Sequence, residues 1–337
     1  MDLAQGVLAG NRLALARTLS QVENGTPEGQ AALSALFSHT GQAHLVGMTG
    51  APGTGKSSLV NHLARCYRQP PEGEAPRRVA VVAVDPTSPF TGGAILGDRI
   101  RMRDLAGDPG VFIRSMATRG SLGGIAAATA AVVQVLDAAG FEMILIETVG
   151  AGQAEVDIAR LAHTTVVVEA PGLGDDIQAI KAGILEIADI LVVNKADLPG
   201  VDSTERALRN MLELAHPTPH HFMHHGQLEI VPQPPEAPEA AEPLWIPPLV
   251  RTVATEGTGV PKLADAIASH RAHLEQTGGW ARRERWRLQA ELDMLLQSRL
   301  VDCWRSNLAA ETYLQALDDL VARRISPHQA AEKLVNC

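Results

Sequence analysis

The residues that point most directly to chemistry lie between Leu45 and Val60, in the sequence LVGMTGAPGTGKSSLV. An apolar run is followed there by a glycine-rich turn and then by the start of a helical pattern. The turn fills every fixed position of the pattern G-x-x-x-x-G-K-[ST], with Gly50, Ala51, Pro52, Gly53, Thr54, Gly55, Lys56 and Ser57. Glycines let several backbone N–H groups face one anion, and the following helix adds the positive end of its dipole. The segment therefore predicts a phosphate-binding loop.

Side chains of this loop have predicted roles of their own. We expect Lys56 to reach the β- and γ-phosphates of a nucleotide, and the Ser57 hydroxyl to ligate Mg²⁺. Ser58 follows in the same helical turn and is included among the nucleotide-binding residues. The loop alone leaves open which base is bound, what accepts the phosphate and what the reaction is for.

Polar residues end three later apolar runs, and ligands of parallel sheets bind at the carboxyl ends of strands. These residues are Asp85, Glu147 and Asn194. We interpret Asp85 as a Mg²⁺ ligand, although an aspartate before proline is also common in turns. Asp98, in a segment with three glycines, is a second candidate for metal binding or water positioning, with a plain surface carboxylate as the alternative.

The sequence Glu147-Thr148-Val149-Gly150 has the spacing of a GTPase motif. In that motif an acid holds a Mg²⁺-bound water, and a glycine three residues further on donates its N–H to the γ-phosphate. Glutamate is one methylene longer than the usual aspartate, and its carboxylate still reaches a metal through water. Gln153 stands too far along to be assigned as the residue that positions the attacking water. That residue stays unassigned, and we expect slow intrinsic hydrolysis.

The sequence Asn194-Lys195-Ala196-Asp197 has the N-K-x-D form that reads guanine. An aspartate can accept hydrogen bonds from both N1–H and the 2-amino group of guanine, which adenine does not offer. Lys195 can lie along the base plane, and Asn194 can bond the base edge and neighbouring loops. The backbone N–H of Ala254, after a further strand-like run, is a candidate donor to guanine O6. The predicted ligands are therefore GTP and GDP with Mg²⁺.

The segment from Ala170 to Lys181 allows two interpretations. It is either a helix start with acidic residues that favour the dipole, or a mobile segment that reports the nucleotide state to a partner. In the second case Lys181 faces the nucleotide site, and we count it with Lys56, Asp98 and Glu147 as a candidate catalytic residue.

Five apolar, β-branched runs alternate with helical segments and form the framework that must position these residues. They cover residues 45–50, 79–85, 141–147, 164–170 and 189–197. Continuous apolar runs indicate strands buried on both faces, so the predicted fold class is α/β, with a mostly parallel central sheet flanked by helices. We expect an N-terminal helical segment at 1–42, a nucleotide-binding domain at 43–277 and a C-terminal helical arm at 278–337.

Composition and charge exclude several classes of protein. The net charge of −9 argues against nucleic-acid binding, and the three widely spaced cysteines suit a reducing cytoplasm. The sequence has no pattern typical of a signal peptide or membrane span. A histidine-rich, proline-rich insert at about 216–248 is either a solvated loop or a Ni²⁺ or Zn²⁺ site.

Apolar residues at helical spacing beyond Gly279 predict a homodimer interface, with packing on the chain's own nucleotide domain as the alternative. The pattern covers two stretches, 288–300 and 313–321. A basic cluster at 282–287 is interpreted as a solvated helix face.

Taken together, the motifs resemble the MeaB/ArgK/MMAA group, the G-protein chaperones of adenosylcobalamin-dependent acyl-CoA mutases. The resemblance covers nearly the whole chain and rests on GAPGTGKS, VAVDPTSPFTGGAILGDRIRM, FIRSMATRGSLGG, ETVGAGQ, GDDIQAIKAGILEIAD and NKAD. It implies a P-loop GTPase of the SIMIBI type and a dimerising C-terminal arm. It also places Asp85, Asp98 and Glu147 on metal and switch carboxylates, and residues 172–181 on a partner-sensing switch.

By this resemblance, GTP binding and hydrolysis gate cofactor delivery to a mutase and help to eject inactivated cobalamin. Three alternatives stay open: a nickel metallochaperone GTPase, a kinase associated with amino-acid transport, and a nucleotide-gated scaffold without useful hydrolysis. Arg160, Ala162 and His163 stand where the family often has acidic or apolar residues.

Overall fold

The structure is a computed structural model of the 337-residue chain. It describes residues 2–85, 103–105, 107–117, 124–148, 154–172, 187–215, 223–224, 227–228 and 244–335. Its contacts divide the chain into two compact units, residues 1–287 and 288–337, and each unit is described by itself. Within the described residues, every helix is too short or too polar to cross a lipid bilayer.

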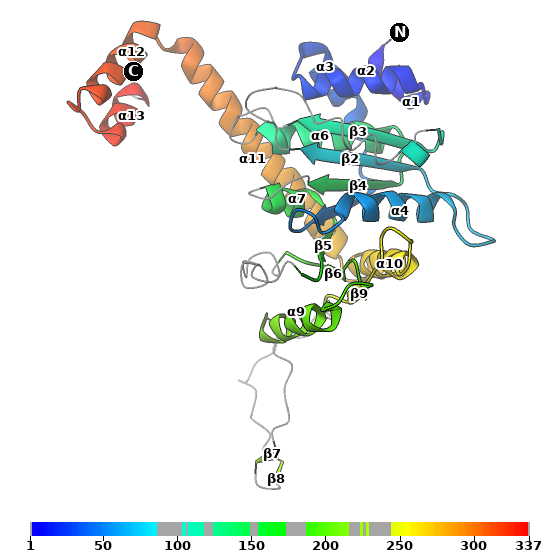
Figure 1. Ribbon diagram of the computed structural model, residues 1–337. Coiled ribbons are helices and arrows are strands. Elements are labelled where there is room, and N and C mark those ends of the chain that lie inside the picture. The colour runs from blue at the N-terminus through cyan, green and yellow to red at the C-terminus, as the bar shows by residue number, and fades with distance from the viewer. Residues whose placement is uncertain are drawn as a thin grey trace. The chain divides into compact units, whose positions relative to one another are not determined.

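The first unit is built on one sheet of seven strands in the order β3-β2-β4-β1-β5-β6-β9, with all neighbours parallel (Figure 1). The strands are β1 (His44–Thr49), β2 (Val79–Asp85), β3 (Val111–Ala117), β4 (Met143–Thr148), β5 (Thr164–Glu169), β6 (Ile190–Val193) and β9 (Leu249–Arg251). The predicted α/β class with a parallel sheet is confirmed. A separate pair of two-residue strands is formed by β7 (Met223–His224) and β8 (Gln227–Leu228).

All five predicted apolar runs form strands, and the edges of the sheet have weaker patterns. Arg114 and Ser115 interrupt the apolar run of β3, which is not among the five. It is an edge strand beside β2, so only part of it is buried. Strand β9, at the other edge, has only three residues. Edge strands need less apolar surface than central ones, so their pattern is weaker.

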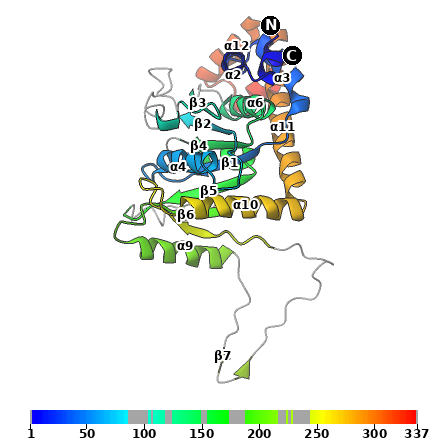
Figure 2. The ribbon, with the colours of Figure 1, turned by 90° about the vertical axis from the view of Figure 1, so that its right-hand side faces the viewer.

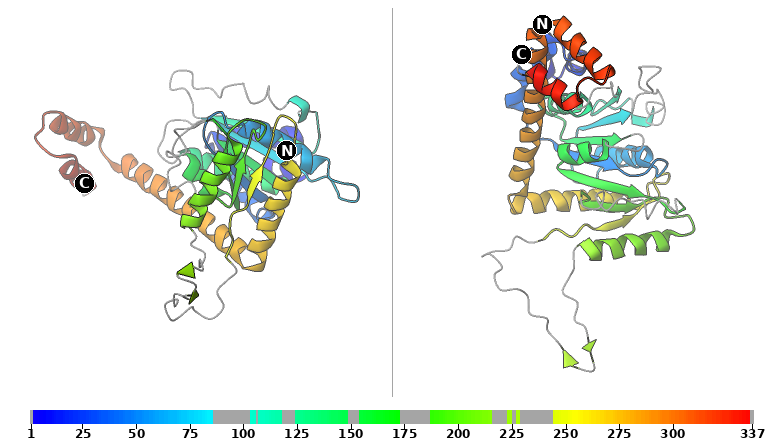
Figure 3. Two further views of the ribbon diagram at one scale, coloured as in Figure 1. Left: turned by 60° about the horizontal axis from the view of Figure 1, so that its bottom comes forward. Right: turned by 90° about the vertical axis from the view of Figure 1, so that its left-hand side faces the viewer.

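Helices cover both faces of the sheet, as the alternation of side chains along each strand requires (Figure 2). On one face α4 (Lys56–Arg68) and α10 (Val260–Gln276) pack against β1, β4 and β5. On the other face lie α6 (Gly124–Ala138) and α7 (Ala154–Leu161), and α9 (Val201–Ala215) continues this layer over β5 and β6 (Figure 3).

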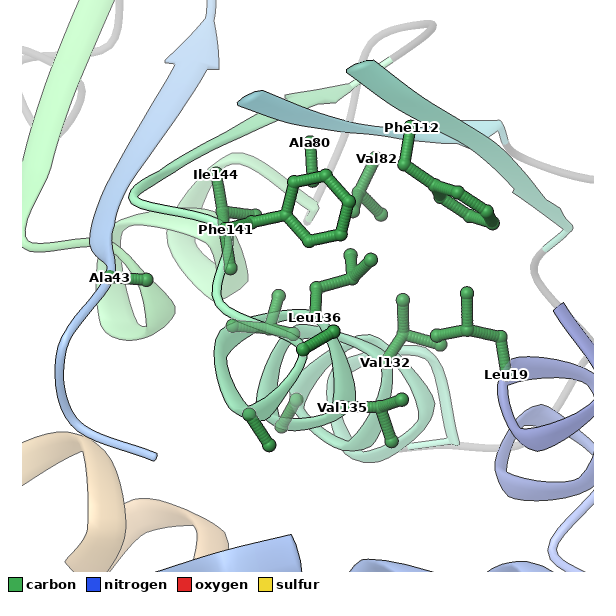
Figure 4. Close-up of a cluster of buried hydrophobic side chains, with 14 of the residues drawn as sticks. Leu19, Ala43, Ala80, Val82, Phe112, Val132, Val135, Leu136, Phe141 and Ile144 are labelled. Carbon is green, nitrogen blue, oxygen red and sulfur yellow. The ribbon is translucent and has the colours of Figure 1, made fainter. Parts of the chain in front are cut away.

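The N-terminal helices pack on α6 and extend the core of that face. They are α1 (Leu3–Leu8), α2 (Arg12–Glu23) and α3 (Pro27–Leu36), followed by the 3-10 turn η1 (Phe37–His39). Figure 4 shows Leu19 of α2 beside Val132 and Leu136 of α6, which also contact the strands. Asn11 begins α2, and its Oδ1 accepts hydrogen bonds from the N–H groups of Leu13 and Ala14. Asn11 is therefore the N-cap of α2.

The remaining helical elements are η2 (Arg103–Leu105), α11 (Gly279–Asn307), α12 (Ala310–Val321) and α13 (Pro327–Val335). Within the second unit, Trp304 of α11 donates its indole N–H to the carbonyl of Leu334 at 2.7 Å. Ser326 and Gln329 form a reciprocal capping box at the start of α13, with bonds of 3.2 and 2.9 Å. Many apolar side chains of this unit are exposed: Leu292, Leu295, Leu296, Leu300, Tyr313, Leu314, Leu317 and Val321.

Candidate nucleotide site

The turn between β1 and α4 requires glycine at two positions. At Gly50, φ is +135° and an added Cβ would lie 2.1 Å from the carbonyl oxygen of Val168 in β5. At Gly55, φ is +93° and a Cβ would lie 2.4 Å from Nδ2 of Asn194. Both contacts are shorter than any side chain tolerates. The glycines of the motif therefore let the turn lie directly against Val168 and Asn194, and such close backbone packing is what a phosphate-binding loop uses glycine for.

The side chains of Lys56 and Ser57 lie buried at the N-terminus of α4, directly after the turn. The Lys56 ammonium donates to the carbonyl oxygens of Gly50 at 2.6 Å and Ala51 at 3.0 Å. Those bonds hold it over the loop, where the predicted phosphate contacts also lie. The first N–H groups of an α-helix such as α4 have no intrahelical acceptors and are free to bind an anion.

Glu147 lies on the face of the sheet that α4 covers. In β4, Met143 and Leu145 belong to the apolar cluster under α4, and Glu147 continues their alternation. Its side chain is completely buried, and its backbone is in register with Met48 of β1. A carboxylate is therefore present beneath α4, where the predicted Mg²⁺ site of a GTPase needs one.

Among the remaining predicted metal-binding and catalytic residues, the structure describes only the backbone of Asp85. The backbone of Asp85 ends β2 opposite Ala117 of β3, at the same edge of the sheet as the turn; its side chain is outside the described part. Asp98, Gly150 and Lys181 lie outside the described residues altogether. Their predicted roles stay predictions.

Asn194 joins three loops at this edge. Its Nδ2 donates to the carbonyl of Thr54 in the phosphate loop at 2.7 Å. Its Oδ1 accepts from the Thr252 hydroxyl and from the N–H of Ala254, each at 3.0 Å. Of the two roles that the sequence allowed, these bonds match the contact with neighbouring loops. The N–H of Ala254, predicted for guanine O6, is used here by Asn194.

A cavity of about 220 Å³ opens beside this junction. It is lined by Gly55, Ser58, Asn194, Lys195, Asp197, Leu198, Val253, Ala254 and Thr255. Asp197 is exposed and therefore available to a ligand, and Lys195 takes the left-handed backbone conformation with φ +55°. The cavity thus unites the predicted phosphate loop with the predicted base-reading tetrapeptide, which are 140 residues apart along the chain.

Sequence reasoning missed the loop residues that complete this cavity and hold Asn194. Thr252 directly follows β9, the three-residue strand that gives only a weak apolar pattern. Its hydroxyl has no motif of its own, because its role depends on a contact 58 residues away in the sequence. Leu198 is an ordinary apolar residue, and its place in the lining follows from the folded arrangement alone.

A glycine cradle at a helix N-terminus, a buried carboxylate beside it and an adjoining cavity at the carboxyl edge of a parallel sheet define a P-loop nucleotide-binding protein. A family model described as methylmalonyl-CoA mutase-associated GTPase MeaB matches residues 15–309. The chain belongs to this family of GTPases, which confirms the resemblance and the GTPase class predicted from the motifs.

Individual relatives agree with this assignment. A putative GTPase of Pyrococcus abyssi is 42% identical over 334 residues, which cover 99% of this chain and 95% of the relative. A Caenorhabditis elegans protein named methylmalonic aciduria type A homolog, mitochondrial, is 34% identical over 209 residues, covering 58% of this chain and 51% of that protein. A crystal structure described as LAO/AO transport system kinase matches with a TM-score of 0.67 and 25% identity, over 99% of this chain and 95% of that one.

Proposed function

We propose that this protein binds and hydrolyses GTP in order to gate the delivery of adenosylcobalamin to a cobalamin-dependent acyl-CoA mutase, and to protect or reactivate that enzyme. The observation that carries the GTP assignment is the bonding of Asn194, which joins the phosphate loop to the cavity that Asp197 lines. One site thus contains groups suited to the triphosphate and groups suited to guanine.

In this proposal each described residue has a separate task. The N–H groups of the turn and of α4 bind the phosphates, and the Lys56 ammonium exchanges its two carbonyl partners for phosphate oxygens. Asp197 accepts the guanine N1–H and 2-amino hydrogens. Ser57 and Glu147 would hold Mg²⁺, directly or through water, together with the predicted ligands Asp85 and Asp98. The ion would neutralise charge on the transferred phosphoryl group.

The mutase partner is supported by the family description and by the name of the nematode relative. The acyl-CoA substrate of that mutase is left open. The exposed apolar side chains of residues 288–337 support a second part of the proposal, a homodimer formed through these helices, because such side chains are usually covered in an assembly. Light scattering of the intact chain tests it: a monomer at micromolar concentration would contradict the dimer.

Hydrolysis measured with and without a mutase tests the main proposal. Alone, the protein should turn over GTP slowly, on the order of 10⁻⁴ to 10⁻² s⁻¹, as unassisted G proteins do. Addition of the correct adenosylcobalamin-dependent mutase should accelerate turnover. The two proteins should also co-elute in gel filtration when a non-hydrolysable GTP analogue is present. The Lys56→Ala variant is the control, because it lacks the ammonium and should lose nucleotide binding or hydrolysis. Neither acceleration nor co-elution with candidate mutases would contradict the chaperone role.

The transport-associated kinase is a second candidate, since the matching crystal structure has that description. It would require transfer of the γ-phosphate to a protein acceptor, and the sequence has nothing that resembles a phosphoacceptor site. Radiolabel from γ-labelled GTP that stays on protein, in place of free phosphate, would favour the kinase. Single-turnover hydrolysis with the partner present separates a GTPase from a nucleotide-gated scaffold.

The nickel metallochaperone rests on the histidine-rich insert, most of which lies outside the described residues. In the described part of the chain there is no group of three potential metal ligands. Titration with Ni²⁺ tests this function, with a variant whose insert histidines are replaced by alanine as the control. If the wild type binds Ni²⁺ no more tightly than that variant, the metallochaperone function is excluded.

A further inference from the structure

A second polar cluster lies at the opposite edge of the sheet, where β1, β5 and β6 begin. Two of its members, His44 and His163, are only 1% and 2% exposed. Trp280, in the first turn of α11, covers both rings: its ring centroid is 4.0 Å from that of His163 and 5.6 Å from that of His44. Buried histidines that the nucleotide site does not use need a separate explanation.

The hydrogen bonds of His163 require a neutral ring. Its Nδ1 accepts the backbone N–H of Leu45 at 3.2 Å, so Nδ1 has no hydrogen, and Nε2–H donates to Glu284 of α11 at 3.1 Å. A proton added to Nδ1 would face the Leu45 N–H and break this bond to β1. Arg283 of α11 also donates to the backbone carbonyl of His163 at 2.6 Å. The neutral ring therefore lies between β1 and α11 and bonds both.

The surroundings of His44 also favour a neutral ring. Its Nε2 lies 2.7 Å from the Thr164 hydroxyl oxygen, which is in turn 2.9 Å from Nδ1 of His270. Nε2 of His270 lies 3.3 Å from Asp189, which accepts both arms of Arg283 at 2.6 and 2.7 Å. Nδ1 of His44 has no hydrogen-bond partner among the described residues, so a ring protonated on both nitrogens would bury an N–H without an acceptor.

Charges around the two rings oppose a further proton. Burial, followed by neighbouring positive groups, lowers the pKa of His44. Burial also lowers the pKa of His163, and the carboxylate of Glu284 offsets only part of that effect. The titratable and charged groups that surround the rings are Arg77 before β2, Asp189 before β6, His270, Arg271 and His273 of α10, and Arg283, Glu284 and Arg287 of α11.

We propose that His44, His163 and Trp280 form a proton-sensitive latch, which holds the first turns of α11 on the amino-terminal edge of the sheet and opens when the two rings take up protons. When Trp280 moves away from the two rings, water reaches them and their pKa values become ordinary. The open state then binds protons more tightly than the latched state, so acid favours the open state. Consider one ring that stays neutral in the latched state and has a pKa of about 6.5 in the open state. Between pH 7.5 and 5.5 it shifts the equilibrium between the two states about tenfold toward the open state. Two rings shift it about a hundredfold.

Hydrogen–deuterium exchange of the full chain tests the latch, with exchange times scaled to the intrinsic rate at each pH. The opening constant of residues 279–287 should rise about a hundredfold from pH 7.5 to 5.5. His163→Gln and His44→Gln should each reduce this to about tenfold, because glutamine does not titrate. The matched control is His328→Gln, which removes an exposed histidine of α13 and should leave the dependence unchanged.

Three results would overturn the proposal. The first is an opening constant of residues 279–287 that is independent of pH in the wild type, and the second is an undiminished pH dependence in both glutamine variants. The third is an equal rise in the opening constant of residues 143–148, which would indicate unfolding of the whole unit. Histidine NMR of the wild type covers the case in which a variant fails to fold. The His44 and His163 rings should titrate below the pKa of about 6.5 of a histidine in an unfolded chain; titration of both rings at that value would contradict the latch.

Discussion

At the scale of single residues, Asp197 offers the sharpest test of base recognition. Its carboxylate is exposed at the cavity and is predicted to accept both the N1–H and the 2-amino hydrogens of guanine. Asp197→Asn replaces one acceptor by a donor, which matches the 2-oxo group of xanthine. We expect GTP affinity to fall at least tenfold, equivalent to about 1.4 kcal/mol, and xanthosine triphosphate affinity to rise. Competition binding with both nucleotides measures this, and unchanged GTP affinity would contradict the assignment of Asp197.

Asn194 should act differently, because all three of its described bonds are made to the protein. Asn194→Ala leaves the carbonyl of Thr54 and the N–H of Ala254 without this partner, and removes the connection between the two loops. Each lost bond to a buried group costs about 1–3 kcal/mol. We expect weaker binding of GTP and of xanthosine triphosphate alike, without a change of preference. Calorimetry with both nucleotides checks this, and a selective loss of GTP alone would argue for direct base contact.

These two residues also mark what the sequence could reveal about the site. The types and order of Asn194 and Asp197 predict a guanine reader, because the tetrapeptide pattern is local. The partners of Asn194 were not predictable, since Thr252 and Ala254 reach it through the folding of β9 against β6. A pattern thus identifies the residues that touch a ligand more readily than those that hold them in place.

At the scale of elements, the central strands were predictable, whereas the edge strand β3 was not. The four strands β1, β2, β4 and β5 are buried on both faces, so their sequences are almost purely apolar. Strand β3 carries Arg114, which forms an ion pair with Glu23 of α2. That contact gives a polar residue a structural role inside a strand, which an apolar pattern cannot reveal.

The packing of α7 on the sheet gives a prediction at this scale. A Cβ at Gly47 in β1 would lie 2.3 Å from Cγ2 of Ile158 and 3.1 Å from Cβ of Ala162. Gly47→Val therefore forces α7 away from β1, and we expect a loss of about 1–3 kcal/mol in the free energy of unfolding. Urea denaturation measures it. The control is Gly107→Ala, where an added Cβ has no atom within 4 Å; equal stability of the two variants would contradict the close contact.

At the scale of the whole molecule, the parallel sheet separates two clusters with different chemistry. The carboxyl edge collects the phosphate loop, the base cavity and Glu147, and part of this could be predicted from motifs. The amino edge collects Asp189 with His44, His163 and Trp280, and none of the last three belongs to a motif. Their association depends on the start points of three strands and one helix, and only the folded chain gives that information.

The amino-edge cluster makes the stability of the first unit depend on pH, and the sign follows from two groups. Burial lowers the pKa of His270 to about 4. The Asp189 carboxylate raises this pKa, and Arg283 and His273 lower it further. Burial would raise the pKa of Glu284, but hydrogen bonds from His163 and Arg287 hold that pKa at about 2. A histidine with a lowered pKa contributes fully above its unfolded value of about 6.5, and its contribution falls as the pH drops toward 4. The glutamate contribution is lost only between about 4.5 and 2.

We therefore expect the free energy of unfolding to fall between pH 7.5 and 5 by on the order of 2 kcal/mol for each histidine that stays neutral in the folded state. Urea denaturation at several pH values measures this, followed by fluorescence and circular dichroism. His270→Gln should remove one such increment and flatten the curve, because the amide does not titrate and the Glu284 contribution is constant in this range. A wild-type stability that is constant from pH 7.5 to 5, or a steep curve that His270→Gln leaves unchanged, would contradict the neutral state of these rings.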